Sequence, residues 1–168
     1  MTGALFLKEV VPTMKIKSVS LVCLFLLTIM VFTACGSAQK DFSPDLDALY
    51  EKLLSDTDTD GMTVLSDRKI ENYMGIAAQD YAKAIIAICG DSVSADEIWL
   101  VEAVDDAAAG RIKALAEERL EYQAEAMKNY LPDQYEILKQ GKVLVKGRYV
   151  ALFVSPEVEK MQALFESA

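Results

Sequence analysis

Apolar residues recur every three or four positions in four segments of the chain, a spacing typical of helices that bury one face. The first begins at Ser43-Pro44, because serine is a good N-cap and proline is well tolerated at the first helical position. The second ends at Gly75, since glycine readily adopts the left-handed conformation of a helix C-terminus. The third is rich in Ala, Glu, Leu and Arg and ends before Pro132. The predicted helices cover residues 43–55, 66–74, 107–130 and a C-terminal segment starting at Ser155-Pro156.

Strands are predicted where apolar runs are short and rich in β-branched or aromatic residues. Ser94 and Glu97 also have the spacing of a capping box, so a helix is the competing interpretation of the segment that follows them. Two alternating apolar segments flank Gly147, which predicts a hairpin. The four predicted strands span residues 81–89, 97–104, 143–146 and 148–155.

The order of these elements predicts one α+β domain over residues 43–168. We expect an antiparallel sheet of about four strands, built from two hairpins, with the long helix between the hairpins and the helices packed on one face. A domain of this size buries enough apolar surface to fold without disulfides.

The segment before this domain has the pattern of an export signal. Lys15 and Lys17 precede the apolar run Val19–Thr33, which is short for a membrane span of about 20 residues. Its end, Phe32-Thr33-Ala34-Cys35, resembles a bacterial lipoprotein lipobox, although Phe32 replaces the usual leucine. That resemblance implies a diacylated Cys35 at the mature N-terminus, and two acyl chains anchor a protein stably. The alternative is an uncleaved membrane anchor.

These features divide the chain into three parts. Residues 1–34 are the predicted signal peptide, of which 1–13 form an upstream extension if translation starts at Met14. Residues 35–42 are the lipidated cysteine and its tether, and residues 43–168 are the folded domain. The expected location is the outer face of the plasma membrane, with the membrane contacted through the lipid.

Charge and composition exclude several classes of function. The chain has 17 basic and 26 acidic residues, a net charge of −9, and its first 34 residues are basic, so the exported part is more acidic still. Such a surface repels nucleic acid. The absence of histidine excludes Ser-His-Asp and Cys-His catalysis and the common zinc sites. Cys89 is the free thiol left in the mature protein, and its apolar neighbours predict that it is buried and inert.

The strongest ligand motif is acidic. Asp56, Asp58 and Asp60, followed by Gly61, match the first positions of an EF-hand calcium loop, in which Met62 would contribute its carbonyl and Asp67 the last carboxylate. Asp67 is shorter than the usual glutamate, and the alternative is a solvated turn between two helices. Calcium is therefore the one possible cofactor, and its expected role is structural.

Other candidate residues lie on the long helix. Arg119 and Gln123 are one turn apart and either bind a carboxylate or make a structural polar contact, which we favour. Glu117, Glu121 and Glu125 repeat every four residues, the spacing of a solvated acidic face. Trp99 is expected in the core.

Five short segments, Tyr73–Ile76, Ala95–Ile98, Arg119-Leu120 with Gln123, Asn129–Tyr135 and Gly147–Val150, form a pattern that is specific as a set. In order and spacing they resemble the bacterial lipoproteins that share the domain of unknown function 4358, over about residues 43–166. The resemblance implies a surface-anchored protein of Gram-positive anaerobes with an α+β fold. It also supports the strands at 81–89 and 97–104, but it implies no activity and no site residue.

The expected function is a non-enzymatic binding or envelope-assembly module that takes an envelope protein or a small ligand. One alternative is an envelope protein stabilised by calcium at the acidic loop. The other is a surface enzyme that works without histidine, through carboxylates or a Ser-Lys pair, in a deep pocket with a perturbed acidic pair.

Overall fold

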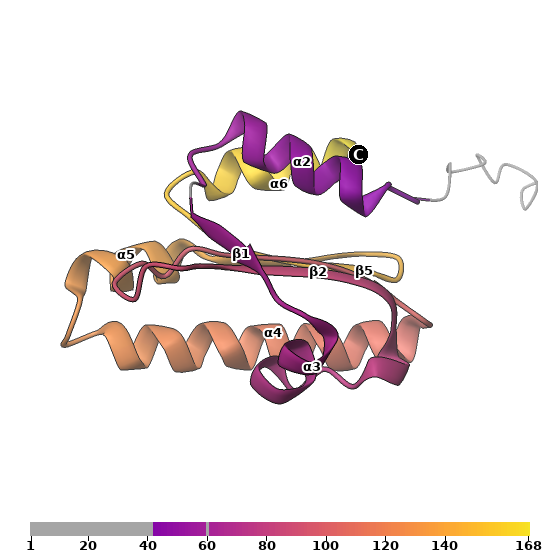
Figure 1. Cartoon of the computed structure of the whole chain (residues 1–168), viewed down its shortest axis with the longest axis horizontal. Helices are drawn as coiled ribbons and strands as arrows, with labels where there is room; N and C mark the ends of the chain where they lie inside the picture. The colour runs from indigo at the N-terminus through magenta and orange to yellow at the C-terminus, as the bar shows by residue number, and fades with distance from the viewer. Residues whose placement is uncertain (1–41, 60) are drawn as a thin grey trace, which may run out of the picture. The chain divides into compact units, whose positions relative to one another are not determined.

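The computed structural model describes residues 42–59 and 61–168, and these form an α+β unit with a sheet between helices (Figure 1). Two short turns, the π-helical η1 and the 3-10 turn η2, precede the first long strand. The elements are α2 (Leu46–Asp56), β1 (Met62–Val64), α3 (Asp67–Lys69), η1 (Ile70–Met74), η2 (Ala78–Asp80), β2 (Tyr81–Cys89), β3 (Glu97–Ala103), α4 (Asp106–Met127), α5 (Pro132–Gln140), β4 (Lys142–Lys146), β5 (Tyr149–Val154) and α6 (Val158–Ser167).

The sheet is antiparallel and has the strand order β1-β2-β3-β5-β4. The two predicted hairpins are present, and β3 joins them by pairing with β5, with Leu100 opposite Ala151. Gly147 turns the second hairpin at φ 59°, a conformation that favours glycine. The α+β class and the antiparallel sheet are thus confirmed. The sheet has five strands rather than about four, because Met62–Val64 adds a short edge strand beside β2.

Helices cover both faces of the sheet, so the prediction of helices on one face is wrong (Figure 1). The physical reason is that β3 and β5 are buried almost throughout, and a strand with two apolar faces needs cover on both. We call the two sides the α4 face and the α2/α6 face, after the helices that cover them. Both described clusters consist of residues from 42 to 168.

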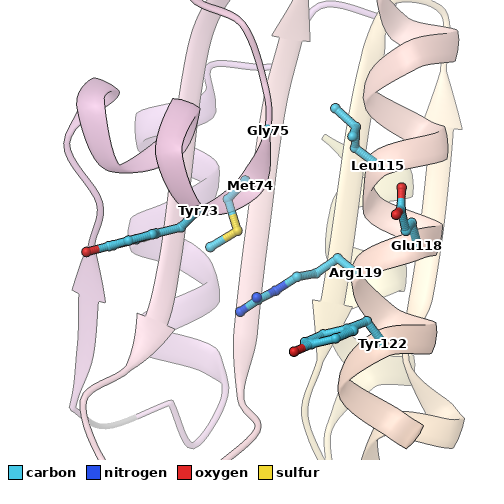
Figure 2. A pocket seen from close by; sticks show the side chains of 7 residues that line it. All are labelled: Tyr73, Met74, Gly75, Leu115, Glu118, Arg119 and Tyr122. Carbon is cyan, nitrogen blue, oxygen red and sulfur yellow. The ribbon is translucent and has the colours of Figure 1, made fainter. Parts of the chain in front are cut away.

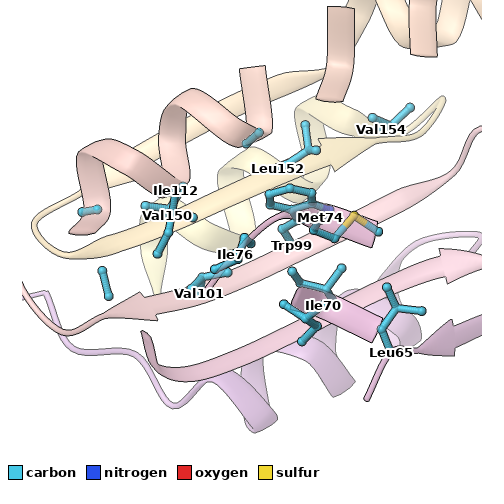
Figure 3. Close-up of a cluster of buried hydrophobic side chains, with 14 of the residues drawn as sticks. Leu65, Ile70, Met74, Ile76, Trp99, Val101, Ile112, Val150, Leu152 and Val154 are labelled. Carbon is cyan, nitrogen blue, oxygen red and sulfur yellow. The ribbon is translucent and has the colours of Figure 1, made fainter. Parts of the chain in front are cut away.

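Each face has its own apolar cluster. On the α4 face, Trp99 and Val101 from the sheet pack with Ile112 from α4 and Ile70 from η1 (Figure 3). The predicted burial of Trp99 is confirmed. On the α2/α6 face, the side chains that fill the layer are mainly aliphatic and phenyl groups, including Leu53, Ile98, Leu100, Phe153 and Phe165.

Helix boundaries differ from the prediction at two points besides α6, which begins at Val158 rather than at Ser155-Pro156. Asp45, not Ser43, is the N-cap of α2, and its carboxylate accepts the backbone N–H of Asp47 at 3.0 Å. A carboxylate at this position also interacts favourably with the helix dipole. The second difference is α5, a helix that starts at Pro132 and was not predicted. Elsewhere, η1 ends at Gly75 with φ 70°, as expected of a glycine C-cap.

The predicted signal peptide (1–34) and Cys35 lie outside the described residues, as does most of the tether. Within residues 42–59 and 61–168, no helix has both the length and the hydropathy needed to cross a membrane.

Candidate functional site

Glu97 is the one charged side chain among the buried residues of the described part of the chain, with 1% of its surface exposed. Both of its carboxylate oxygens accept hydrogen bonds. The Arg119 Nη2 group donates to Oε2 at 2.9 Å, and Gln123 Nε2 donates to the same oxygen at 3.0 Å. The Trp99 indole N–H donates to Oε1 at 2.5 Å. The carboxylate is therefore fully engaged by three side chains.

Strand alternation explains why these groups meet. Glu97 and Trp99 are two residues apart on β3, so both point to the α4 face. Arg119 and Gln123 are one turn apart on α4 and point to the sheet. The favoured alternative, that this pair makes a structural polar contact within the fold, is confirmed. The identity of the partner was missed, although a glutamate opening an otherwise apolar strand was a visible signal.

A buried ion pair is a poor way to gain stability, because desolvation offsets most of the attraction between the charges. The pair between Glu97 and Arg119 has a clear geometric consequence. Glu97 holds the Arg119 guanidinium in place, while the arginine side chain keeps 24% of its surface exposed. The Oε1 atom of Gln123 is buried and finds no partner among the described residues. The cluster thus presents a fixed arginine at the edge of the core.

A cavity of about 320 Å³ lies on the exposed side of Arg119, between η1 and α4 (Figure 2). Met74, Gly75 and Leu115 contribute apolar wall, and Glu118 contributes a carboxylate. Tyr73 and Tyr122 also line the cavity, yet they remain 64% and 71% exposed. Large exposed aromatic side chains beside a cavity are typical of binding surfaces.

The backbone on one side of this cavity is unusual. η1 is a π-helical turn, a rare conformation that is frequent at functional sites. It ends at Gly75, whose Cα faces the Leu115 side chain of α4, so that an added Cβ would contact Leu115 Cδ2 at 3.5 Å. The turn therefore brings Met74 and Gly75 toward the middle of α4, while the Tyr73 side chain extends away from that helix (Figure 2).

The predicted calcium ligands are only partly placed. Asp56 ends α2, where hydrogen bonds from Lys52 and Ser55 lower the pKa of its carboxyl group. Met62 belongs to β1 and Asp67 to α3. Asp60 lies outside the described residues. In the part that is described, no three acidic or cysteine side chains are grouped to hold a metal, so the calcium site stays a prediction.

Asp58 instead faces the start of α6. Its backbone N–H donates to Glu157 Oε2 at 2.5 Å, and this bond lowers the pKa of the Glu157 carboxyl group. Asp58 and Glu157 line a second cavity together with Asp96 and Pro156. This contact ties the acidic segment to α6 on the α2/α6 face.

Two remaining predictions have opposite outcomes. The three glutamates Glu117, Glu121 and Glu125 are exposed, as expected of a solvated helix face. The prediction that Cys89 is buried is wrong, because this residue lies at the end of β2 and is partly exposed.

Comparison with known proteins identifies the domain. The family defined as Domain of unknown function (DUF4358) matches residues 55–155, which is more than half of the chain. The chain belongs to this family. No curated protein and no solved structure matches it.

The DUF4358 match includes the whole of the site described above. Tyr73 and Arg119, on the two sides of the cavity, and Glu97 beneath it all fall within residues 55–155. Most of α2 and all of α6 fall outside it. The segments Tyr73–Ile76, Ala95–Ile98 and Arg119 with Gln123 supported the resemblance to this family, and in the fold they meet around Glu97.

Proposed function

We propose that this DUF4358 protein is a non-enzymatic binding module, held at the outer face of the plasma membrane by lipid on Cys35. The cavity between η1 and α4 is its binding site. The observation that carries the proposal is the exposed Tyr122 beside an arginine fixed by the buried Glu97 (Figure 2).

The surroundings of the cavity favour binding over catalysis. The described carboxylate nearest to Arg119, Glu97, is occupied by three hydrogen bonds, so it is not free to accept a proton from a substrate. The chain contains no histidine that would act as a general base. The lipobox-like Phe32–Cys35 segment supports the anchor.

The anchor is tested by metabolic labelling with an alkyne-bearing fatty acid in the cells that make the protein. We expect label on the wild-type protein and none on Cys35→Ser, which should be released from the membrane fraction. Equal labelling of both proteins, or an unlabelled wild type, would reject the lipid anchor.

The binding site is tested by placing the photo-crosslinking residue benzoylphenylalanine at position 122 of the full chain, in intact cells. The matched control is position 130, because Tyr130 is equally exposed but does not line the cavity. A crosslinked product from position 122 and none from position 130 supports the module. The same products at both positions, or none at 122, would overturn it.

A further inference from the structure

The ion pair between Glu97 and Arg119 is oriented with the arginine toward the cavity. Glu97 has 1% of its surface exposed, whereas 24% of the Arg119 side chain is exposed and lines the cavity. The two charges cancel at long range, but at the cavity wall the positive guanidinium is the nearer of the two. An acceptor placed there meets a charged donor, and charge-assisted hydrogen bonds are stronger than neutral ones.

The Arg119 guanidinium also keeps an edge that Glu97 does not use. A guanidinium is a planar fork of N–H donors, and Glu97 accepts from Nε at 3.2 Å and from Nη2 at 2.9 Å. The opposite edge, formed by Nη1 and the second N–H of Nη2, bonds to no residue of the described chain. Its two N–H groups are parallel, the arrangement that both oxygens of a carboxylate accept.

The other groups at the cavity indicate what such a carboxylate would carry. Figure 2 shows the Arg119 side chain extending from α4 toward Met74, with Tyr122 beside it. Met74 and Leu115 offer apolar contacts. The Glu118 carboxylate lies along α4 and away from the guanidinium, so it does not occupy the unused edge (Figure 2). We propose that the cavity binds a monocarboxylate with a small apolar group, its oxygens on the unused edge of Arg119; this rests on the proposed binding function.

The charges around the cavity favour a singly charged ligand over a phosphate group. Arg119 is the one cation among the described residues that line the cavity, and Glu118 adds a negative charge there. The chain also has a net charge of −9, which repels a dianion more than a monoanion. The same charges predict weak binding, in the millimolar range. A small organic acid and the C-terminus of a peptide both have the required chemistry.

The experiment uses 4-methylpentanoate as the probe and the full chain in detergent micelles. The chain has one tryptophan, so its indole N–H gives one side-chain peak in a ¹⁵N-correlated NMR spectrum. That N–H bonds to Glu97, which holds Arg119, so the peak reports on the cavity. We expect a saturable shift with the sodium salt of the acid and none with sodium chloride. The neutral 4-methylpentanamide, of similar shape, should bind about tenfold more weakly.

A change of charge beside the cavity tests whether the ligand is an anion. Glu118→Gln removes a repulsive charge and should tighten binding of the acid about threefold. The matched control is Glu117→Gln, because Glu117 is exposed on the same helix but does not line the cavity. It should bind as the wild type does. Both glutamates are exposed, so both variants are expected to fold, and an unchanged thermal midpoint checks this.

Two further variants test the position of the ligand. Arg119→Lys keeps a positive charge beside Glu97 but has no second edge of parallel donors, so it should weaken binding about tenfold. Tyr122→Ala should weaken binding about fivefold, whereas Tyr130→Ala should not. Because Tyr122 is exposed, its variant tests the site even if Arg119→Lys unfolds.

A peptide probe distinguishes the two sources of the carboxylate. Acetyl-dialanyl-leucine has the same apolar group and a free carboxylate. Tighter binding of this peptide than of 4-methylpentanoate would identify the C-terminus of a peptide as the ligand. Equal or weaker binding of the peptide would identify a small organic acid.

The remaining outcomes separate this inference from the proposed function. No saturable shift with either carboxylate, equal binding of the amide, or no tightening in Glu118→Gln would overturn the carboxylate ligand. A crosslinked product at position 122 would still support the binding module in that case. If crosslinking at position 122 fails as well, both proposals are rejected.

Discussion

The two faces of the sheet differ in the kinds of side chain that pack against them. The α2/α6 face is closed by aromatic rings, with Phe42 and Phe153 packed edge-on against Phe165 at centroid distances of 5.2 and 6.2 Å. The α4 face encloses a buried carboxylate and its arginine beneath an open cavity. Edge-to-face rings add to the stability that burial provides, whereas a buried ion pair adds little. Both faces are well packed. We infer that the α2/α6 face contributes stability alone, whereas the α4 face also carries the proposed binding site.

The family match follows the same division. It includes β2, β3, α4 and η1, but it ends before α6 begins and starts inside α2. The polar contacts of the α2/α6 face lie at its rim, where Glu157 accepts from Asp58 and Lys160 donates to the Asp56 carbonyl. The comparison can therefore be tested by changing each face separately and measuring both stability and binding.

The largest effect is expected from Phe153→Ala on the α2/α6 face. Phe153 is fully buried, so its removal leaves a cavity and should lower the free energy of unfolding by about 3–5 kcal/mol. Urea unfolding followed by circular dichroism measures this change. Val145→Ala on the edge strand is the control, because Val145 is 45% exposed and should change stability by only about 0.5 kcal/mol. A loss of stability no larger than that of the control would contradict the proposed role of this face.

Arg119→Met tests the α4 face. It leaves the Glu97 carboxylate buried without its counter-ion and should lower the free energy of unfolding by about 3 kcal/mol. Adding Glu97→Gln removes the buried charge, so the double variant should regain about 1 kcal/mol relative to Arg119→Met. The matched control is Arg111→Met on the same helix. Its ion pair with Asp80 lies near the surface, so its loss should lower the stability much less than Arg119→Met does.

A double variant no more stable than Arg119→Met would contradict this account, because the buried charge would then not be the source of the loss. If instead the double variant is as stable as the wild type, the pair contributes nothing to folding. Its presence beneath the cavity would then be explained by the position that it gives to Arg119.

The strands and the long helix could be predicted because their signals are local. Composition marks β2 and β3, and Gly147 marks the second hairpin. The two-sided cover of the sheet was also visible in principle, since the unbroken apolar run in Tyr149–Val154 is typical of a strand buried on both faces. Alternation was assumed instead. α5 was missed because Pro132 was interpreted only as the end of α4, although proline also suits a helix start.

The site was harder to predict because it depends on contacts between distant residues. Arg119 and Gln123 could be placed on one side of a helix, but Glu97 lies 22 residues before Arg119. Nothing in helical spacing links the two positions. The cavity likewise requires the π-helical turn at Ile70–Met74, and that conformation is not encoded in a simple periodicity.

Calcium should change the free energy of unfolding less than these substitutions do. Its effect should be confined to the acidic loop that follows α2. If the acidic loop binds with a Kd of about 1 mM, calcium at about 2 mM would stabilise the fold by about 0.6 kcal/mol. Thermal unfolding with calcium and with chelator measures this shift, which Asp58→Asn should abolish and Asp91→Asn, in another exposed loop, should not. Equal midpoints with and without calcium would leave the segment as a solvated turn.

The smallest effect concerns the rim of the α2/α6 face and depends on pH. The pKa of Glu157 lies below its ordinary value of 4.5, because the Asp58 N–H and then Lys160 favour the carboxylate. A lowered pKa in the folded state means that the contact stabilises the protein above pH 4.5 and that this stabilisation is lost as the pH falls through the folded pKa. Glu157→Gln should therefore unfold at a lower temperature than the wild type at neutral pH, and the two midpoints should converge as the pH falls through the folded pKa of Glu157. Glu121→Gln, on the exposed side of α4, is the control and should unfold as the wild type does at neutral pH. A gap between wild type and Glu157→Gln that persists in acid would show that packing, not charge, makes Glu157 important at this rim.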